Sequence, residues 1–236
     1  MTILLDVAGL QAFYGRAQVL FGLSFQLRAG EVVALVGRNG AGKTTTLRAL
    51  MGLVEARFER LTFKGRSIAG LPAFRIARAG LGYVPEDRRI FTDLTVEENL
   101  EVGRRTARAG PTSWTPERLM QLFPNLAEMK GRRGGQMSGG EQQMLSIART
   151  LMGNPDAILL DEPSEGIAPV IVQMMAEAVR AMKREGVAVL LSEQNWAFAA
   201  GIADSACVIE RGEMRFSGTI TDFLADESLR VQTLGV

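Results

Sequence analysis

The chain has 236 residues, of which 47% are hydrophobic, so it is long and apolar enough to build a core. The chain has 27 lysine and arginine residues and 26 aspartate and glutamate residues. This balance gives no excess of positive charge that would attract nucleic acid, so we expect no nucleic-acid partner. The one cysteine, Cys207, lies in an apolar stretch and is expected in the core, and without histidine a zinc site is not expected. The sequence begins without a signal-peptide pattern, and no apolar run approaches about 18 residues, so we expect no membrane span.

Strand and helix signals take turns along the chain. Alternating apolar and β-branched residues predict strands, and continuous apolar runs are typical of strands buried on both faces. The predicted strands are at 3–7, 19–27, 31–37, 157–162 and 187–193, and a helix is predicted at 44–53. This alternation predicts an α/β domain with a mainly parallel sheet.

The pattern changes between 87 and 154, where the sequence is mostly helical. This stretch carries arginine runs, a Gly-Pro turn at 110–111 and a glycine cluster at 131–140. We interpret 87–154 as a helical subdomain inserted into one domain of 236 residues, whose sheet core is formed by 1–86 and 155–236.

The stretch "GRNGAGKTT" at 37–45 fits G-x-x-x-x-G-K-[ST] between a predicted strand and a predicted helix. Its glycines let the backbone wrap around phosphates, so that loop N–H groups and the helix N-terminus point at negative charge. Lys43 is expected between the β- and γ-phosphates of ATP, and the Thr44 hydroxyl on Mg²⁺. The alternative is a glycine-rich turn with a solvated lysine. The candidate nucleotide-binding residues here are Gly37, Arg38, Asn39, Gly40, Ala41, Gly42, Lys43, Thr44 and Thr45.

An acidic pair, Asp161 and Glu162, ends the predicted strand "AILLDE". Ligands bind at this edge of parallel sheets. We expect Asp161 to hold Mg²⁺ through its water shell and Glu162 to orient and polarise the attacking water. Such a pair is a weak signal alone, and it gains weight from the phosphate loop.

A third motif, "MSGGEQQMLSIARTLM", starts at Met137. Ser138 and Glu141 have the spacing of a capping box, which predicts a helix start. Gly139 and Gly140 weaken the first turn but expose backbone N–H groups, as at an anion site; an ordinary capped helix is the alternative. The expected apolar stripe is Met144, Leu145, Ala148 and Leu151 or Met152.

In this order and spacing the motifs resemble those of the ATP-binding cassette ATPases. "GRNGAGKTT" resembles their phosphate loop, "AILLDEP" their second metal-binding strand, "MSGGEQQ" their signature loop, and "SEGIAP" at 164–169 the loop linking two active sites. The resemblance covers nearly the whole chain. It implies a P-loop NTPase fold with a mainly parallel RecA-like sheet, an N-terminal antiparallel β subdomain and the inserted helical subdomain.

The resemblance also implies a working dimer. Two ATP molecules would be sandwiched between head-to-tail subunits, with the signature loop of one subunit closing on the γ-phosphate held by the other. Tyr14, in "AFYGRAQVL", matches the aromatic residue on which adenine stacks; a surface tyrosine is the alternative. The signature residues implied at the nucleotide are Ser138, Gly139, Gly140 and Glu141.

Finer features resemble one subgroup. "GLGYVPEDRRIFTDLTVEENL" (80–100), "DEPSEGIAP", "LSEQN" and the ending "LRVQTLGV" resemble the shorter ATPase subunit of importers of branched-chain and related hydrophobic amino acids. The urea-importer ATPase is a near relative. This implies a peripheral position on the cytoplasmic face of the membrane, a second ATPase subunit, transmembrane permeases and an external solute-binding protein. Leucine, another amino acid, urea and an aromatic acid stay open as solutes, since binding protein and permease select the solute.

Two residues depart from the broad cassette pattern. At Glu86 most members have a glutamine that reaches Mg²⁺; a carboxylate keeps the hard oxygen and adds a charge. At Gln194 most members have a histidine that contacts the γ-phosphate; glutamine keeps an N–H donor but cannot titrate near neutral pH. The resemblance marks both as subgroup features, with Glu86 and Gln194 still implied in catalysis.

Two other functional classes remain open at this point. Soluble cassette proteins of translation or DNA repair usually join two cassettes or carry a long coiled coil, and this sequence has neither. A regulatory module that binds nucleotide without turnover is suggested by Glu86 and Gln194 alone. Permease docking is expected on the helical insert and on "EDRRIF" at 86–91, with a solvated charge run as the alternative.

Overall fold

A computed structural model describes residues 2–105 and 113–234 of the chain. The Gly-Pro turn predicted at 110–111 and the last two residues of the ending "LRVQTLGV" lie outside the described residues.

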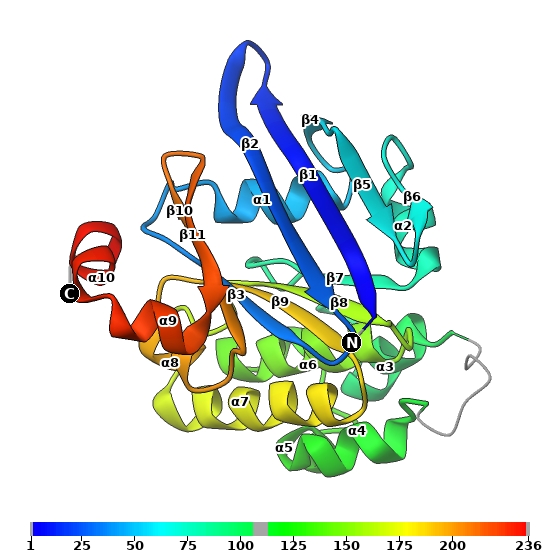
Figure 1. The fold of residues 1–236 in the computed structure, drawn as a ribbon. Helices are drawn as coiled ribbons and strands as arrows, with labels where there is room; N and C mark the ends of the chain where they lie inside the picture. The colour runs from blue at the N-terminus through cyan, green and yellow to red at the C-terminus, as the bar shows by residue number, and fades with distance from the viewer. Residues whose placement is uncertain (1, 106–112, 235–236) are drawn as a thin grey trace.

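Two sheets form the scaffold (Figure 1). The first is antiparallel and contains, in spatial order, β2 (Ala17–Arg28), β1 (Ile3–Tyr14), β5 (Arg60–Phe63) and β6 (Arg66–Ser67), with β4 (Glu55–Arg57) also paired to β1. The second is parallel except at one edge, and contains β11 (Glu213–Thr219), β10 (Ser205–Glu210), β3 (Val32–Val36), β9 (Ala188–Glu193), β8 (Ala157–Asp161) and β7 (Leu81–Val84). The expected α/β architecture with an N-terminal antiparallel unit is therefore confirmed.

The helices pack on the sheets or on one another. They are α1 (Lys43–Leu50), α2 (Ala73–Ala79), α3 (Val96–Gly103), α4 (Pro116–Leu122), α5 (Pro124–Glu128), α6 (Gly139–Leu151), α7 (Pro169–Arg184), α8 (Trp196–Ala200), α9 (Ile220–Ala225) and α10 (Glu227–Leu234). Figure 1 shows α6 and α7 on one side of the second sheet and the long β1 and β2 strands on the other. Among the described residues of 87–154, the α-helices are α3 to α6, and the division of this segment from the core as a subdomain stays a prediction.

The central strands are apolar throughout because both of their faces are covered. In β3, Val33 and Leu35 join the core shared by α1 and the antiparallel sheet, whereas Val32, Ala34 and Val36 face the other core. Side chains of a strand alternate between faces, so a strand with two covered faces has no polar period.

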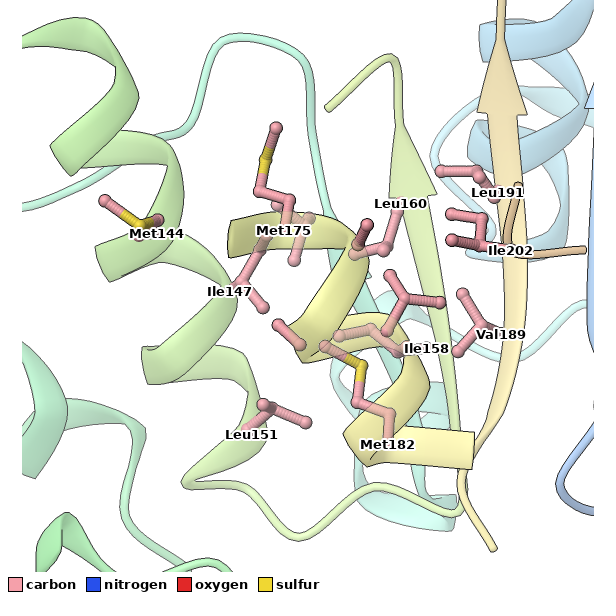
Figure 2. Close-up of a cluster of buried hydrophobic side chains, with 14 of the residues drawn as sticks. Met144, Ile147, Leu151, Ile158, Leu160, Met175, Met182, Val189, Leu191 and Ile202 are labelled. Atoms are coloured by element: carbon pink, nitrogen blue, oxygen red, sulfur yellow. The ribbon is translucent and has the colours of Figure 1, made fainter. Parts of the chain in front are cut away.

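The core that contains Val32, Ala34 and Val36 also contains side chains of α6 and α7, and it holds these two helices against the second sheet. Figure 2 shows side chains of α6, of α7 and of the adjoining strands in one buried cluster, among them Met144, Ile147, Leu151, Met175, Met182, Ile158, Leu160, Val189 and Leu191. All four positions of the predicted α6 stripe are buried, which confirms it, and Cys207 is buried in the other core as expected.

The helix predicted at 44–53 is wrong at its C-terminal end, since α1 stops at Leu50. Gly52 takes a left-handed φ of 65°, and a Cβ there would lie 2.8 Å from the Leu71 carbonyl oxygen. The Leu53 N–H returns to the Arg48 carbonyl at 2.9 Å, which is the hydrogen bond of a glycine-terminated helix. Apolar residues beyond Leu50 concealed this stop from the pattern.

Candidate functional site

The loop at 37–42 lies between β3 and α1, and close packing fixes its course. A Cβ on Gly37 would lie 2.3 Å from the Ile209 carbonyl oxygen, so only glycine fits without a shift of backbone. Gly42 takes a φ of 113° and starts α1 with no side-chain cap and no acidic residue in the first turn. Uncapped first-turn N–H groups at a helix N-terminus favour an anion, so the loop suits phosphate. Within the loop, Arg38, Asn39 and Gly40 are exposed.

Lys43 is buried at the start of α1, with 3% of its surface exposed. Its Nζ donates to the carbonyl oxygens of Gly37 at 2.8 Å and Arg38 at 3.2 Å. It also forms an ion pair with Glu162 Oε1 at 3.0 Å. An ammonium has three donors, so each has a partner here, and a phosphate entering the loop must exchange with one of them.

Asp161 ends β8 and is fully buried. Its Oδ1 accepts from Thr44 Oγ1 at 2.9 Å and from Ser192 Oγ at 2.8 Å, and its Oδ2 accepts from the Tyr83 hydroxyl at 3.0 Å. Burial, followed by the charge of Asp161, raises the pKa of Tyr83, so that hydroxyl keeps its proton and donates near neutral pH. Three donors from three elements therefore fix the carboxylate.

The distance between the Thr44 hydroxyl and the Asp161 carboxylate shows whether both oxygens could bind one Mg²⁺. The Thr44 hydroxyl and the near carboxylate oxygen of Asp161 lie 2.9 Å apart, which is about the separation of neighbouring ligands in an octahedron with bonds of ~2.1 Å. Across residues 2–105 and 113–234 no group of three or more acidic, histidine or cysteine side chains could hold a metal ion. Phosphate and water oxygens would have to supply the remaining ligands.

Glu162 follows Asp161 with an unusual backbone. Its φ is 44°, which is left-handed for a residue with a side chain and costs on the order of 1–3 kcal/mol. The Glu162 N–H donates to the carbonyl and the hydroxyl of Ser192, both at 3.1 Å, which holds the backbone there. A hydrogen bond with Glu162 raises the pKa of Glu165, and the charge of Glu86 adds to the effect.

The end of β9 lies beside this turn. Glu193 is buried, with 2% exposed, and its carboxylate accepts from the Ser164 N–H at 3.1 Å and the Asn195 N–H at 3.2 Å. Burial raises the pKa of Glu193 to about 7, against the effect of these N–H donors. Gln194 comes next and is exposed, so it lies past the strand and not within it.

Glu86 begins the segment 86–91 and is exposed. Two residues later the chain turns through Arg88 and Arg89, whose φ values are 60° and 47°. The Arg88 carbonyl accepts from Ser146 Oγ at 2.7 Å, and the Arg89 carbonyl from Arg149 Nη2 at 2.7 Å. Both donors belong to α6, so that helix holds the segment after Glu86 in place.

The signature motif occupies the N-terminus of α6. The capping box is confirmed, because Ser138 Oγ accepts from the Glu141 N–H and the Glu141 carboxylate accepts from the Ser138 N–H. A Cβ on Gly139 would lie 2.8 Å from the Arg88 guanidinium, and one on Gly140 would lie 3.1 Å from Ile171. These neighbours come from segments other than 37–45, so within one subunit the nearest contacts of both glycines lie away from the phosphate loop.

Tyr14 ends β1 and is 47% exposed. The hydroxyls of Tyr83 and, to a smaller extent, Tyr14 raise the pKa of Arg48 on α1. Tyr14 therefore lies near Arg48 of α1 and is about half exposed, which leaves part of the side chain available for stacking.

Sequence reasoning missed the residues that hold this site together. Tyr83, Ser192 and Glu193 are polar residues in or at the ends of otherwise apolar strands, and that was the available signal. Arg88 and Arg149 lie in arginine-containing stretches that resemble solvated charge, and only their contacts identify them.

An apolar groove of about 470 Å³ opens between α2, α3 and α6. Among its lining residues Phe74, Phe91 and Val102 are exposed by 55%, 47% and 55%. Tyr83 and Arg149 line it as well, so the groove borders residues that contact Asp161 and the segment after Glu86.

Residues 20–165 match the family described as ABC transporter. The chain is 42% identical to the high-affinity branched-chain amino acid transport ATP-binding protein BraG of Pseudomonas aeruginosa, over 94% of this chain and 96% of BraG. It is 29% identical to a probable branched-chain amino acid transport ATP-binding protein, LivF, of Archaeoglobus fulgidus, over 99% of both chains. It is 34% identical to the lipopolysaccharide export system ATP-binding protein LptB of Acidithiobacillus ferridurans, over 100% of this chain and 98% of LptB.

Solved structures agree on the fold. An ATP-binding subunit of an ABC transporter superposes with a TM-score of 0.82 at 29% identity, covering 98% of this chain and 96% of that one. A nucleotide-free ATP-binding cassette superposes with a TM-score of 0.81 at 24% identity, covering 97% of both chains, and it supports the fold alone.

Proposed function

The chain belongs to the ABC transporter family of ATP-binding proteins, and we propose that it energises an importer of branched-chain or related hydrophobic amino acids. The protein is an ATPase subunit of a transporter, since that is what its family and relatives are. The observation that carries the substrate class is the 42% identity to BraG over nearly the full length of both chains. Importers of urea or aromatic acids are the alternative within the same resemblance.

The nucleotide would bind with its phosphates in the loop at 37–45 and its adenine on Tyr14. The Lys43 ammonium would give up its hydrogen bonds to the loop carbonyls and its ion pair with Glu162. Oxygens of the β- and γ-phosphates would take their place. Thr44, Asp161 and Glu86 would hold Mg²⁺, whose chemistry is to neutralise charge on the phosphates. The loop N–H groups would then stabilise the charge that develops during transfer.

Glu162 would orient the water that attacks the γ-phosphate. Its carboxylate pairs with Lys43 at 3.0 Å, so it already lies where the terminal phosphate would arrive. When Lys43 turns to phosphate, the carboxylate is released and can accept a hydrogen bond from water. Gln194, exposed at the end of β9, would donate an N–H to the γ-phosphate.

A second subunit would complete each site. Ser138, Gly139, Gly140 and Glu141 lie on α6, and the nearest atoms around the two glycines belong to Arg88, Ile167 and Ile171. A head-to-tail partner would therefore have to supply its own α6 N-terminus to the γ-phosphate.

The test of this mechanism is Glu162→Gln. The variant should bind ATP and dimerise, because Lys43, Thr44 and Asp161 remain, but its phosphate release should fall to almost nothing. Glu177→Gln makes the same chemical change on α7, at a carboxyl that pairs with Arg180 at 2.7 Å, and should retain most turnover. If Glu162→Gln retained ATP hydrolysis, Glu162 would not be the residue that orients the attacking water.

We propose that the transmembrane permease docks in the apolar groove. The groove includes parts of the helical insert and Phe91 of the segment 86–91, where docking was expected from the sequence. No helix in the described residues is long and apolar enough to cross a membrane, so attachment to the cytoplasmic face would depend on such a contact. An aromatic and aliphatic groove of this size fits an apolar segment of a partner.

A matched pair of variants tests the docking surface. Val102→Asp places a charge in the groove and should abolish co-purification with the permease, whereas Val231→Asp changes a valine of similar exposure, 53% against 55%, on α10 and should not. Equal retention of the permease by both variants would exclude the groove. The permease and binding protein that co-purify with the wild-type chain should then be tested for stimulation of ATPase activity by leucine, urea and an aromatic acid.

A further inference from the structure

Two loops of the site begin at neighbouring strand ends. The first follows β8 and contains Glu162 and Ser164, and the second follows β9 and contains Gln194. One side chain joins them, because the two oxygens of Glu193 accept from the Ser164 N–H and from the Asn195 N–H.

The burial of the Glu193 carboxylate costs free energy. Glu193 is 2% exposed, and a buried carboxylate is unfavourable unless its oxygens receive hydrogen bonds. The carboxylate makes no ion pair within the described residues, and the nearby charge of Glu162 has the same sign. An apolar side chain, as at 188–191 of the same strand, would fill this position without the cost of a buried carboxylate. The two N–H bonds are therefore the feature that this side chain supplies.

The positions of the two donors give the contact its meaning. Asn195 directly follows Gln194, and its N–H is held by the residue directly before Gln194, so the carboxylate closes a short turn around Gln194. Ser164 opens the loop 164–169, whose Ile167 lies within 3.5 Å of the Cβ position of Gly140. The same carboxylate thus contacts the backbone directly after the proposed phosphate contact and at the root of the loop that reaches α6.

We propose that Glu193 is a positioning residue that holds Gln194 and the loop 164–169 in one fixed relation. The inference rests on the proposed function, in which Gln194 contacts the γ-phosphate. Glu193 does not itself touch the phosphate loop, so it acts through these two backbone amides. A shift of Gln194 on loss of the γ-phosphate would then be passed to Ser164 and on toward α6.

The first test is independent of turnover. Hydrogen exchange of the amides of Ser164 and Asn195 should accelerate at least tenfold in Glu193→Ala, because both lose their acceptor. In Glu193→Gln only one of the two should accelerate, because an amide offers one acceptor oxygen. Unchanged protection of both amides in Glu193→Ala overturns the inference, even if the protein proves to lack ATPase activity.

The second test is kinetic. At pH 8, kcat should fall at least tenfold in Glu193→Ala and less in Glu193→Gln, while the KM for ATP stays within about twofold because the phosphate loop is intact. Combining Glu193→Ala with Gln194→Ala should be less than multiplicative, since the two residues act together. A kcat unchanged per folded molecule, or equal changes of kcat and KM, would count against the inference.

A second buried glutamate provides the control. Glu31 is 8% exposed, and its carboxylate accepts from the Arg28 N–H and Ser205 Oγ, both at 2.9 Å, at the start of β3 and β10 and away from the site. Glu31→Ala should lower the unfolding midpoint and leave kcat per folded molecule unchanged. If Glu31→Ala reduced kcat as much as Glu193→Ala, the effect would be general destabilisation and the inference would be wrong.

Discussion

Removing one hydroxyl tests how firmly the site carboxylate is held. Tyr83→Phe deletes the O–H that donates to Asp161 Oδ2 at 3.0 Å, together with the interaction of that hydroxyl with Arg48, and it keeps the aromatic ring in the groove. Asp161 is fully buried, so water cannot replace the lost donor without a rearrangement. Thr44 and Ser192 still donate to the other oxygen.

The size of the effect follows from the charge of the acceptor. A hydrogen bond to a charged group contributes about 1.5–3 kcal/mol, and a buried acceptor that loses its donor carries the full desolvation cost. The free energy of unfolding should therefore fall by about 1.5–3 kcal/mol. For a chain of this length such a loss lowers the unfolding midpoint by about 3–12 °C.

The assay is urea unfolding at neutral pH with a matched deletion as control. Tyr14→Phe removes the same O–H from a tyrosine that is 47% exposed, where water replaces the lost partner. Its effect should stay within about 0.5 kcal/mol. If Tyr83→Phe also changed stability by less than about 0.5 kcal/mol, Asp161 would not depend on this donor and the account of its three-point fixation would be wrong.

Three further outcomes test other parts of the site. Gln194→Ala should slow ATP hydrolysis, whereas Gln194→His should preserve it and add a pH dependence near about 6–7, measured as phosphate release; an unchanged rate in the alanine variant refutes the contact. The pKa of Glu193 is raised to about 7, so its contribution to stability is complete below about pH 4.5 and is lost as pH rises through 7. Glu193→Gln should thus gain stability relative to wild type by on the order of 3 kcal/mol between about pH 4 and pH 8, and parallel pH profiles would contradict this. Gly37→Ala should destabilise by about 1–3 kcal/mol through the clash with Ile209, while Gly131→Ala, with open space at its Cβ, should change stability little; equal effects in urea unfolding would exclude the clash.

The local sequence determined the central buried strands, the start of α6 and the chemistry of the loop at 37–45. Strands buried on both faces read as continuous apolar runs, and the capping box at Ser138 predicted where α6 begins, because these signals depend on neighbours in sequence. The motif at 37–45 predicted a phosphate site since its glycines and lysine act within one turn of backbone. The same locality explains the error at α1, whose end depends on contact between Gly52 and Leu71.

Only the tertiary structure decided what holds the site residues. Thr44, Tyr83 and Ser192 meet at Asp161 from three separate elements, and no spacing in the chain relates them. In the sequence, Glu193 is only the polar end of an apolar strand. Its two N–H donors come together because β8 and β9 lie side by side in the sheet. Hydrogen bonds between distant segments depend on how far apart the segments lie in the folded protein. The order of residues along the chain does not give that distance directly.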